Sequence, residues 1–125
     1  MMDWYWIPTA MIFCHVIEDF HIQGILADLK QKHWWKMQTG ESRYYNDYIP
    51  SIIAHGFEWS VFIHIPLIYT YGFIPPIFIS VVVNTFIHAY IDDLKCNRHR
   101  LNLIQDQSLH IIEIIITAWM ITLLA

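Results

Sequence analysis

Residues 48–91 of the chain read YIPSIIAHGFEWSVFIHIPLIYTYGFIPPIFISVVVNTFIHAYI, and this stretch decides the fold. It contains two long apolar segments, Tyr48 to Tyr71 and Phe73 to Ile91, which are separated by a short uncharged connection centred on Gly72. About 20 consecutive apolar residues are enough for a helix to cross a bilayer. A proline near the start of each segment suits the first turn of a helix. The stretch therefore predicts two membrane helices joined by a tight turn.

Two further apolar segments flank this pair, one from Trp4 to Ile25 and one from Leu103 to Ala125. Their polar ends shorten the uninterrupted apolar part to about 14 or 15 residues, which a tilted helix or a locally thinned bilayer can accommodate. The expected fold class is all-α: a four-helix transmembrane bundle forming a single integral membrane domain over residues 1–125. An aromatic-rich amphipathic loop, residues 27–47, is expected between helices 1 and 2.

The composition agrees with a membrane protein. Of 125 residues, 56% are hydrophobic and only 14% are charged, and the mean hydropathy is +0.37. A soluble domain usually carries about 25% charged residues, so a small soluble globular protein is the less favoured alternative. The sequence has no run of basic residues of the kind that indicates nucleic-acid binding. The N-terminus lacks the features of a cleaved signal peptide and is expected to be retained.

The basic residues predict the orientation in the membrane. They lie in the first and third connections and are absent from the second, and basic loops favour the cytoplasmic side. Loops 1 and 3 are therefore expected in the cytoplasm and both termini outside, in a bacterial inner (host cell) membrane. The oligomeric state stays open. The basic residues concerned are Lys30, Lys32, Lys36, Arg43, Lys95, Arg98 and Arg100.

Three histidine–aspartate pairs, each with a spacing of four residues, lie at the ends of the apolar segments. Residues four apart share one face of a helix, so each pair offers an imidazole and a carboxylate in the same direction. In the expected topology all three pairs lie near the cytoplasmic side, and a further histidine begins the second helix at that level. Gln23, at the end of the first segment, is expected at the same level. We call the seven ionisable residues of this level the polar layer: His15, Asp19, His55, His88, Asp92, Asp106 and His110.

The polar layer predicts a metal site. Ionisable side chains in a membrane helix are costly when they face lipid, so they turn inward and pair. Histidine and carboxylate ligands on facing helices bind metal ions in helical bundles, and zinc, manganese and iron are all chemically suitable divalent metals. Hydrogen-bonded pairs or a proton path without metal are the alternative. The predicted ligands, for one ion or for two, are His15, Asp19, His88, Asp92, Asp106 and His110.

Three more residues are candidates for catalysis. His55 is a further ligand or a general base. Glu58 and Glu113 each follow a histidine of the layer by three residues and therefore share its face at a deeper level. A desolvated carboxylic acid there could act as a general acid or support a ligand, and a structural hydrogen bond is the equal alternative. His64 and His21 are rotated away and are left outside the site.

The ordered segments HVIEDFHIQ, DLKQKH, AHGFEWSVFIH, HAYIDDLK and DQSLHIIEI span residues 15–113. This pattern resembles an uncharacterised family, a domain of unknown function, of small polytopic membrane proteins from bacteria and phages. The residues 26–28 are Leu-Ala-Asp, where the family usually has Met-Ala. The resemblance implies membrane localisation and the same polar layer, and it implies no reaction. The motif residues kept here are His15, Asp19, Phe20, Gln23, Lys30, His55, His88, Asp92, Lys95, Asp106, Gln107 and His110.

The function predicted from these patterns is metal-dependent hydrolysis of a lipid-linked or amphipathic substrate in the bilayer. A bound metal lowers the pKa of water and polarises a substrate oxygen. A looser similarity, to integral membrane proteins described as metal-dependent hydrolases, is analogy alone. The alternative is a non-enzymatic membrane protein, namely a phage helper, a pore former or a proton-coupled carrier that uses the same polar layer.

Overall fold

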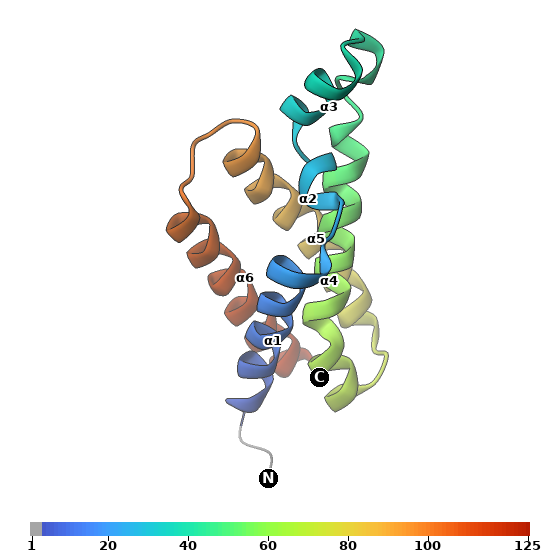
Figure 1. The fold of residues 1–125 in the computed structure, drawn as a ribbon. Coiled ribbons are helices and arrows are strands. Elements are labelled where there is room, and N and C mark those ends of the chain that lie inside the picture. The colour runs from blue at the N-terminus through green and yellow to red at the C-terminus, as the bar shows by residue number, and fades with distance from the viewer. Residues whose placement is uncertain (1–3) are drawn as a thin grey trace.

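A computed structural model describes residues 4–125, and every regular element within them is a helix (Figure 1). The predicted all-α class is therefore confirmed, whereas residues 1–3 of the predicted retained N-terminus lie outside the described part. The elements are α1 (Trp6–Ile17), the π-helical η1 (Glu18–Ile22), α2 (Leu26–Leu29), α3 (Lys32–Thr39), the 3-10 helix η2 (Ser42–Tyr44), α4 (Tyr48–Tyr71), α5 (Pro75–Cys96) and α6 (Leu103–Leu124).

Three helices, α4, α5 and α6, are long and apolar enough to cross a membrane. The bounds of α4 agree with the predicted apolar segment, and α5 continues beyond Ile91 to Cys96. By contrast, α1 has only 12 α-helical residues before η1 extends it. The segment predicted as an amphipathic loop is not an irregular loop throughout. It contains the short helices α2, α3 and η2.

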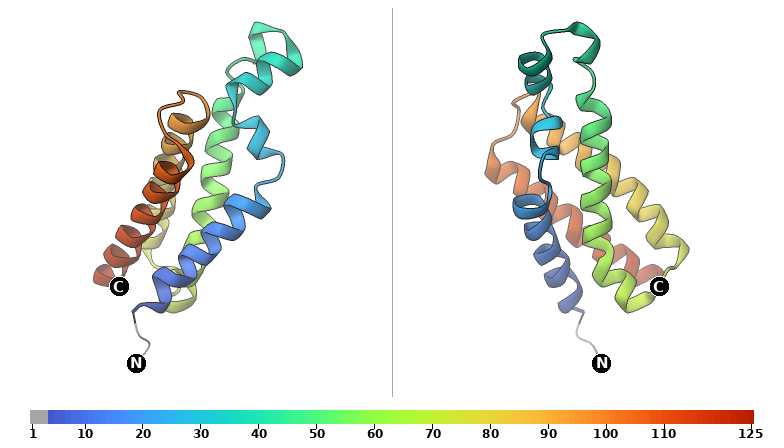
Figure 2. Two further views of the ribbon diagram at one scale, coloured as in Figure 1. Left: turned by 60° about the vertical axis from the view of Figure 1, so that its left-hand side comes forward. Right: turned by 45° about the vertical axis from the view of Figure 1, so that its right-hand side comes forward.

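The long helices run alternately up and down (Figures 1 and 2). Helix α4 packs against both α1 and α5, and α6 packs against α1 and α5. The α4–α5 turn at Gly72 and the C-terminus lie at one end of the molecule, while α3 and the α5–α6 connection lie at the other. Each of these helices therefore presents an inward face to at least two of the others.

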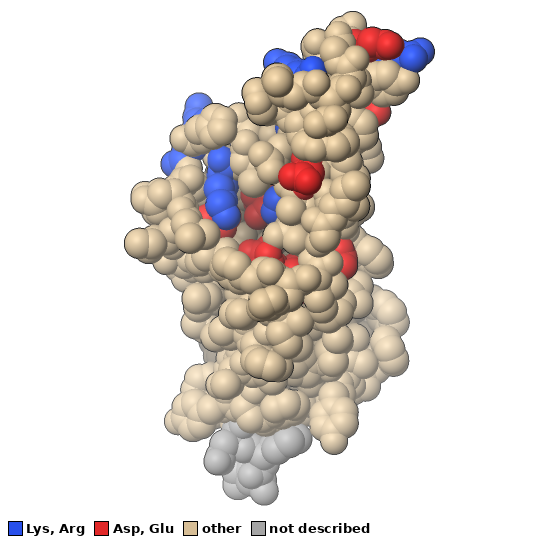
Figure 3. All heavy atoms as spheres, in the orientation of Figure 1, with Lys and Arg blue, Asp and Glu red and all other residues tan. Residues whose placement is uncertain are grey.

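The interior has an apolar half and a polar half. The hydrophobic core includes Met11, Trp59, Ile63, Leu67 and Ile114, and lies toward the end that holds the C-terminus. On the face drawn in Figure 3, all Lys, Arg, Asp and Glu atoms appear in the opposite half. The outward faces of the long helices are rich in exposed apolar side chains, as a surface in contact with acyl chains requires.

Gly56 sets the distance between α4 and α5. A Cβ atom at this position would lie 2.5 Å from the backbone oxygen of Thr85 and 3.4 Å from the Cβ of Ala89. Small residues at such crossings let membrane helices approach closely. The neighbouring His55 depends on this approach, because it faces His88 across the same interface.

We expect a Gly56→Ala variant to be less stable than the wild type by about 1–3 kcal/mol, the usual cost of overpacking an interior. The added methyl group must push the backbones of α4 and α5 apart. Chemical unfolding in detergent micelles measures the change, and Phe57→Leu on the exposed side of α4 is the matched control. Equal free energies of unfolding for Gly56→Ala and the wild type would contradict this interpretation of the contact.

Candidate functional site

The structure brings the polar layer together inside the bundle. Its members come from α1 and η1, α4, α5 and α6, and every one of them is buried. The helices place them there because each residue of the predicted pairs lies on the inward face of its helix. The predicted common depth of these side chains therefore agrees with the described geometry.

His55 lies at the centre of one half of the layer. Its Nε2 atom is 3.1 Å from Nε2 of His88, 3.2 Å from Oδ2 of Asp92 and 3.5 Å from Oδ1 of Asp19. Ligands at 2.0–2.1 Å around a tetrahedral ion are separated from one another by about 3.3 Å. The distances from Nε2 of His55 to these three atoms are therefore close to the separation of two ligands of one ion.

His110 lies at the centre of the other half. Its Nε2 atom is 3.3 Å from Oδ1 of Asp92 and 3.3 Å from Oδ1 of Asp106. Asp92 thus presents Oδ2 to His55 and Oδ1 to His110. Three sets within the layer have ligand atoms mutually within 4.8 Å and could hold a metal ion: Asp19–His55–His88, His88–Asp92–His110 and Asp19–Asp106–His110.

A carboxylate lies behind each of the two central histidines. Oε1 of Glu18 is 3.3 Å from Nδ1 of His55, and Oε2 of Glu113 is 3.7 Å from Nδ1 of His110. In metal sites a carboxylate commonly accepts the second ring N–H of a ligating histidine, which leaves the other nitrogen free to bind the ion. The Glu18–His55 pair is close to this arrangement at 3.3 Å, whereas Glu113 at 3.7 Å is near His110 without a hydrogen bond, and both histidines direct Nε2 into the layer.

His15 was a predicted ligand, but the structure does not bring it into any of these sets. Nε1 of Trp59 donates a hydrogen bond to its Nδ1 atom at 2.8 Å. Because an indole nitrogen can only donate, Nδ1 of His15 carries no proton and Nε2 is the donor to Oε1 of Gln107 at 2.9 Å. Both nitrogens of His15 are therefore occupied by the protein itself.

Gln107 extends this network to two aspartates. Its Nε2 atom donates to Oδ2 of Asp19 and to Oδ2 of Asp106, each at 3.0 Å. The amide thereby uses its oxygen on His15 and both hydrogens on carboxylates. We interpret His15 and Gln107 as residues that orient the aspartates.

Two lysines contribute positive charge at the edge of the layer. Nζ of Lys30 lies 2.7 Å from Oδ2 of Asp92 with both side chains buried, and Nζ of Lys95 lies 2.9 Å from Oδ2 of Asp106. Burial works to lower the pKa of the Lys30 ammonium, but the Asp92 carboxylate outweighs it, and the pKa is raised. Lys30 is therefore a permanent cation at neutral pH.

Five contributors to the site, the residues Glu18, Lys30, Trp59, Lys95 and Gln107, were not among the predicted site residues. Glu18 and Asp19 are both buried because the wider π-helical turn of η1 begins at Glu18, and such turns occur at functional sites. Lys30 reaches the layer because the side-chain amide of Asn97, the residue directly after α5, donates a hydrogen bond of 3.1 Å to the backbone oxygen of Lys30. Trp59 stacks on His88 at 4.0 Å and separates the layer from the apolar core. The spacing of four residues between His55 and Trp59 places both on one face of α4, so the sequence could have indicated that Trp59 lies at the site.

The remaining sequence candidates lie around the layer. Glu113 supports His110 as described, and Glu58 is half-buried in a separate set with Glu18 and His55. His64, which was left outside the site, is fully buried and lies away from the layer. Its Nδ1 is 2.6 Å from the backbone oxygen of Ser60, and its Nε2 is 2.8 Å from Oγ of Ser80.

Several buried polar atoms of the site have no hydrogen-bond partner among the described residues. Leaving a buried polar group unsatisfied costs about 1–3 kcal/mol, and folded proteins contain few such groups unless a water or an ion satisfies them. The unpartnered carboxylate oxygens among them are what a cation-binding residue set predicts. The buried atoms concerned are both carboxylate oxygens of Glu18 and of Glu113, Oδ1 of Asp106, and Nδ1 of His55, His88 and His110.

Fold and site together define a small helical protein with three helices of membrane-spanning length and a buried histidine–carboxylate cluster that could hold a metal ion. Comparison of the chain with protein-family models, with curated proteins and with solved structures yields no match. The functional argument therefore rests on the geometry of the site.

Proposed function

We propose that this chain is an integral membrane hydrolase whose polar layer binds one or two divalent metal ions, zinc, manganese or iron, and acts on an amphipathic or lipid-linked substrate. The observation that carries the proposal is the position of Asp92. Its two oxygens face two different histidines at 3.2 and 3.3 Å, and each of those histidines has a carboxylate behind it. Carboxylates shared between two ligand sets are typical of metal sites in helical bundles.

The membrane part of the proposal treats α1 with η1 as a fourth span. Residues 6–22 form a helical rod of about 25 Å at 1.5 Å per residue, close to the thickness of the hydrocarbon core. Phe13 and Val16 are exposed on it, as expected for contact with lipid. The basic loops at the end that holds α3 support a cytoplasmic position for that end, in a bacterial inner membrane. The motif resemblance to small polytopic membrane proteins supports the same location.

A divalent ion bound by these residues would lower the pKa of a water molecule and polarise a substrate oxygen. The protein residues then have separate tasks. His55, His88, His110, Asp19, Asp92 and Asp106 are the proposed ligands. Glu18 and Glu113, 3.3 and 3.7 Å from Nδ1 of His55 and of His110, are proposed to orient these two histidines, and Glu58, beside His55, is the proposed proton acceptor or donor. In hydrolysis the water oxygen bonds to the reacting centre, the bond to the leaving group breaks, and the leaving group takes the proton.

Metal analysis of protein purified from membranes tests this proposal. We expect a stoichiometric divalent metal in the wild type and also in a His15→Gln variant, because both nitrogens of His15 are used in hydrogen bonds within the protein. Elemental analysis after removal of free metal measures the content. A wild-type protein without stoichiometric metal would end the proposal, and loss of metal in His15→Gln would return His15 to the ligand set.

A second candidate function, a non-enzymatic proton-coupled carrier, is favoured by a different observation. Lys30 and Lys95 already neutralise Asp92 and Asp106 without an ion. A second polar chain, in which His64, Ser80, Asn84 and Thr117 are linked by hydrogen bonds, continues toward the other end of the bundle. Proton uptake by liposomes that contain metal-free protein would favour this function over hydrolysis.

A further inference from the structure

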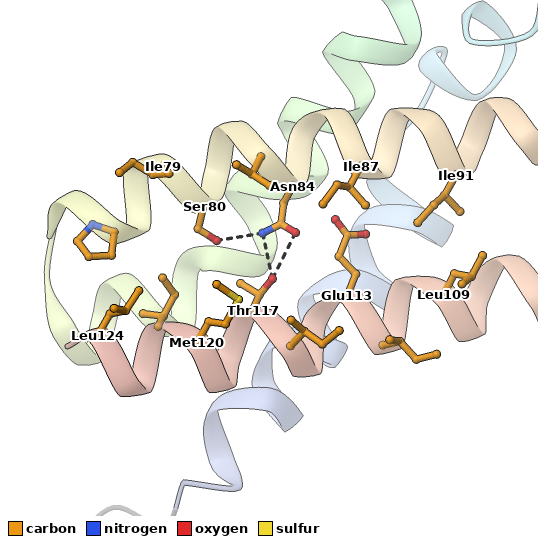
Figure 4. Close-up of a pocket in the computed structure, with 15 residues that line it drawn as sticks. Ile79, Ser80, Asn84, Ile87, Ile91, Leu109, Glu113, Thr117, Met120 and Leu124 are labelled. Atoms are coloured by element: carbon orange, nitrogen blue, oxygen red, sulfur yellow. Dashed lines mark hydrogen bonds between the residues drawn. The ribbon is translucent and has the colours of Figure 1, made fainter.

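A groove of about 480 Å³ lies between α5 and α6 (Figure 4). Cavities of roughly 300–1,000 Å³ are typical of small-molecule sites. The lining is largely branched aliphatic, with Ile79, Val83 and Ile87 on α5 and Ile112 and Ile116 on α6. In the membrane-embedded arrangement proposed above, such a groove suits a hydrocarbon chain.

The length and direction of the groove relate it to the site. Its lining runs on α5 from Pro76 to Ile91 and on α6 from Leu109 to Leu124. Fifteen helical steps correspond to roughly 22 Å, the length of a long extended acyl chain. Ile91 directly precedes Asp92 and Leu109 directly precedes His110, so one end of the groove lies at the depth of the polar layer.

Glu113 connects the groove to the layer. Its side chain is one of the groove's lining groups and extends from α6 toward α5 near Ile87 (Figure 4). The residue is only 8% exposed, and its Oε2 atom lies 3.7 Å from Nδ1 of His110, too far for a hydrogen bond; among the described residues neither carboxyl oxygen has a hydrogen-bond partner. A buried polar group without a hydrogen bond is unfavourable, so the place of Glu113, one turn from Leu109 at the layer end of the groove, points to a ligand whose polar end lies at that end.

The end of the groove at the depth of the layer also carries positive charge. Lys95 lies one helical turn beyond Ile91 on α5, and its side chain is 31% exposed. Its ammonium group uses one donor on Asp106 and has further donors for an anion. A phosphate head at this position would lie beside Asp106, one of the proposed metal ligands, which is 2.9 Å from the Lys95 ammonium.

We infer that the α5–α6 groove binds the single hydrocarbon chain of the substrate, an alkyl phosphoester whose phosphate lies at the Lys95 end beside the polar layer. This inference rests on the proposed hydrolase function and names its substrate class. The chain fills the aliphatic groove, and the phosphate faces Lys95 and the metal ligands. Ordinary two-chain bilayer lipid is not the expected occupant, because one narrow groove accepts one chain.

Photo-crosslinking in phosphatidylcholine nanodiscs tests the inference. The probe is hexadecyl phosphate with a photoreactive group in its chain, and mass spectrometry maps the labelled residues. We expect labels on the groove faces of α5 and α6. A Val83→Trp variant fills the groove and should lower labelling about tenfold, whereas Val82→Trp, on an exposed neighbouring position outside the groove, should leave it unchanged.

Two outcomes would overturn the inference. One is equal labelling of the groove by a phosphatidylcholine that carries the same photoreactive chain, which would make the groove an ordinary lipid contact. The other is labelling of wild-type protein spread evenly over all exposed helix faces, a result that does not depend on the folding of any variant. Crosslinking reports the position of the hydrocarbon chain and not turnover. A wild-type protein that is labelled in the groove but binds no metal would therefore refute the proposed function and leave the groove assignment standing.

Discussion

An Asp92→Asn variant is expected to lose the bound metal of the proposed site. Asp92 is the residue whose two oxygens face both halves of the polar layer, at 3.2 Å from Nε2 of His55 and 3.3 Å from Nε2 of His110. The asparagine side chain carries no negative charge. Its amide nitrogen takes the place of one carboxylate oxygen and cannot coordinate a metal ion. Losing only a residue that supports a ligand costs about 10–100-fold in metal affinity, so losing Asp92 itself should cost at least that much.

His64→Asn is the matched control, because His64 is as buried as the layer histidines but both of its nitrogens are bonded elsewhere. Titration of metal-free protein against a competing chelator measures the affinity of each variant. We expect His64→Asn to retain the wild-type affinity. Wild-type affinity in Asp92→Asn would remove Asp92 from the ligand set and with it the observation that carries the proposal.

A Lys30→Met variant is expected to lose about 3–5 kcal/mol of stability when metal is absent, the usual cost of leaving one charge of a buried ion pair without its partner. The Lys30–Asp92 pair is 2.7 Å long, and the two side chains are only 8% and 3% exposed. Methionine preserves the approximate length of the lysine side chain but carries no charge. Chemical unfolding of EDTA-treated protein in detergent gives the free energy of unfolding.

Lys95→Met provides the comparison. The Lys95 side chain is 31% exposed, and its partner Asp106 keeps a hydrogen bond from Gln107. Solvent therefore compensates for much of the lost charge, and we expect a clearly smaller loss of stability than for Lys30→Met. Equal losses in the two variants would mean that burial of the Lys30–Asp92 pair does not control its contribution.

The sequence predicted the elements of the fold where the signal is local. Segment length and apolar composition identified α4, α5 and α6 nearly to their ends, because a long uninterrupted apolar run depends on neighbouring residues alone. The spacing of four residues placed His88 with Asp92, and Asp106 with His110, on a shared helix face, because helix period is also a local property. The region between α1 and α4 was less predictable, because its short helices α2 and α3 have few residues and no strong period.

The roles within the site could not be predicted from spacing. His15 has the same spacing to Asp19 as His88 has to Asp92, yet the two histidines differ in their neighbours. Nε1 of Trp59 occupies Nδ1 of His15, whereas Nε2 of His88 faces Nε2 of His55. The partner of each ring nitrogen is supplied by a different helix, and no pattern within one helix contains it.

By itself, then, the sequence determined that the regular structure is helical, which helices are apolar enough for a bilayer, and that imidazoles and carboxylates share faces at the ends of the long segments. Tertiary structure alone decided which of them face one another. The π-helical turn of η1 turned Glu18 inward, and Asn97 held the segment with Lys30 against α5. The physical reason is that helix period is a local property, whereas rotation about the helix axis is fixed by packing against residues distant in the chain.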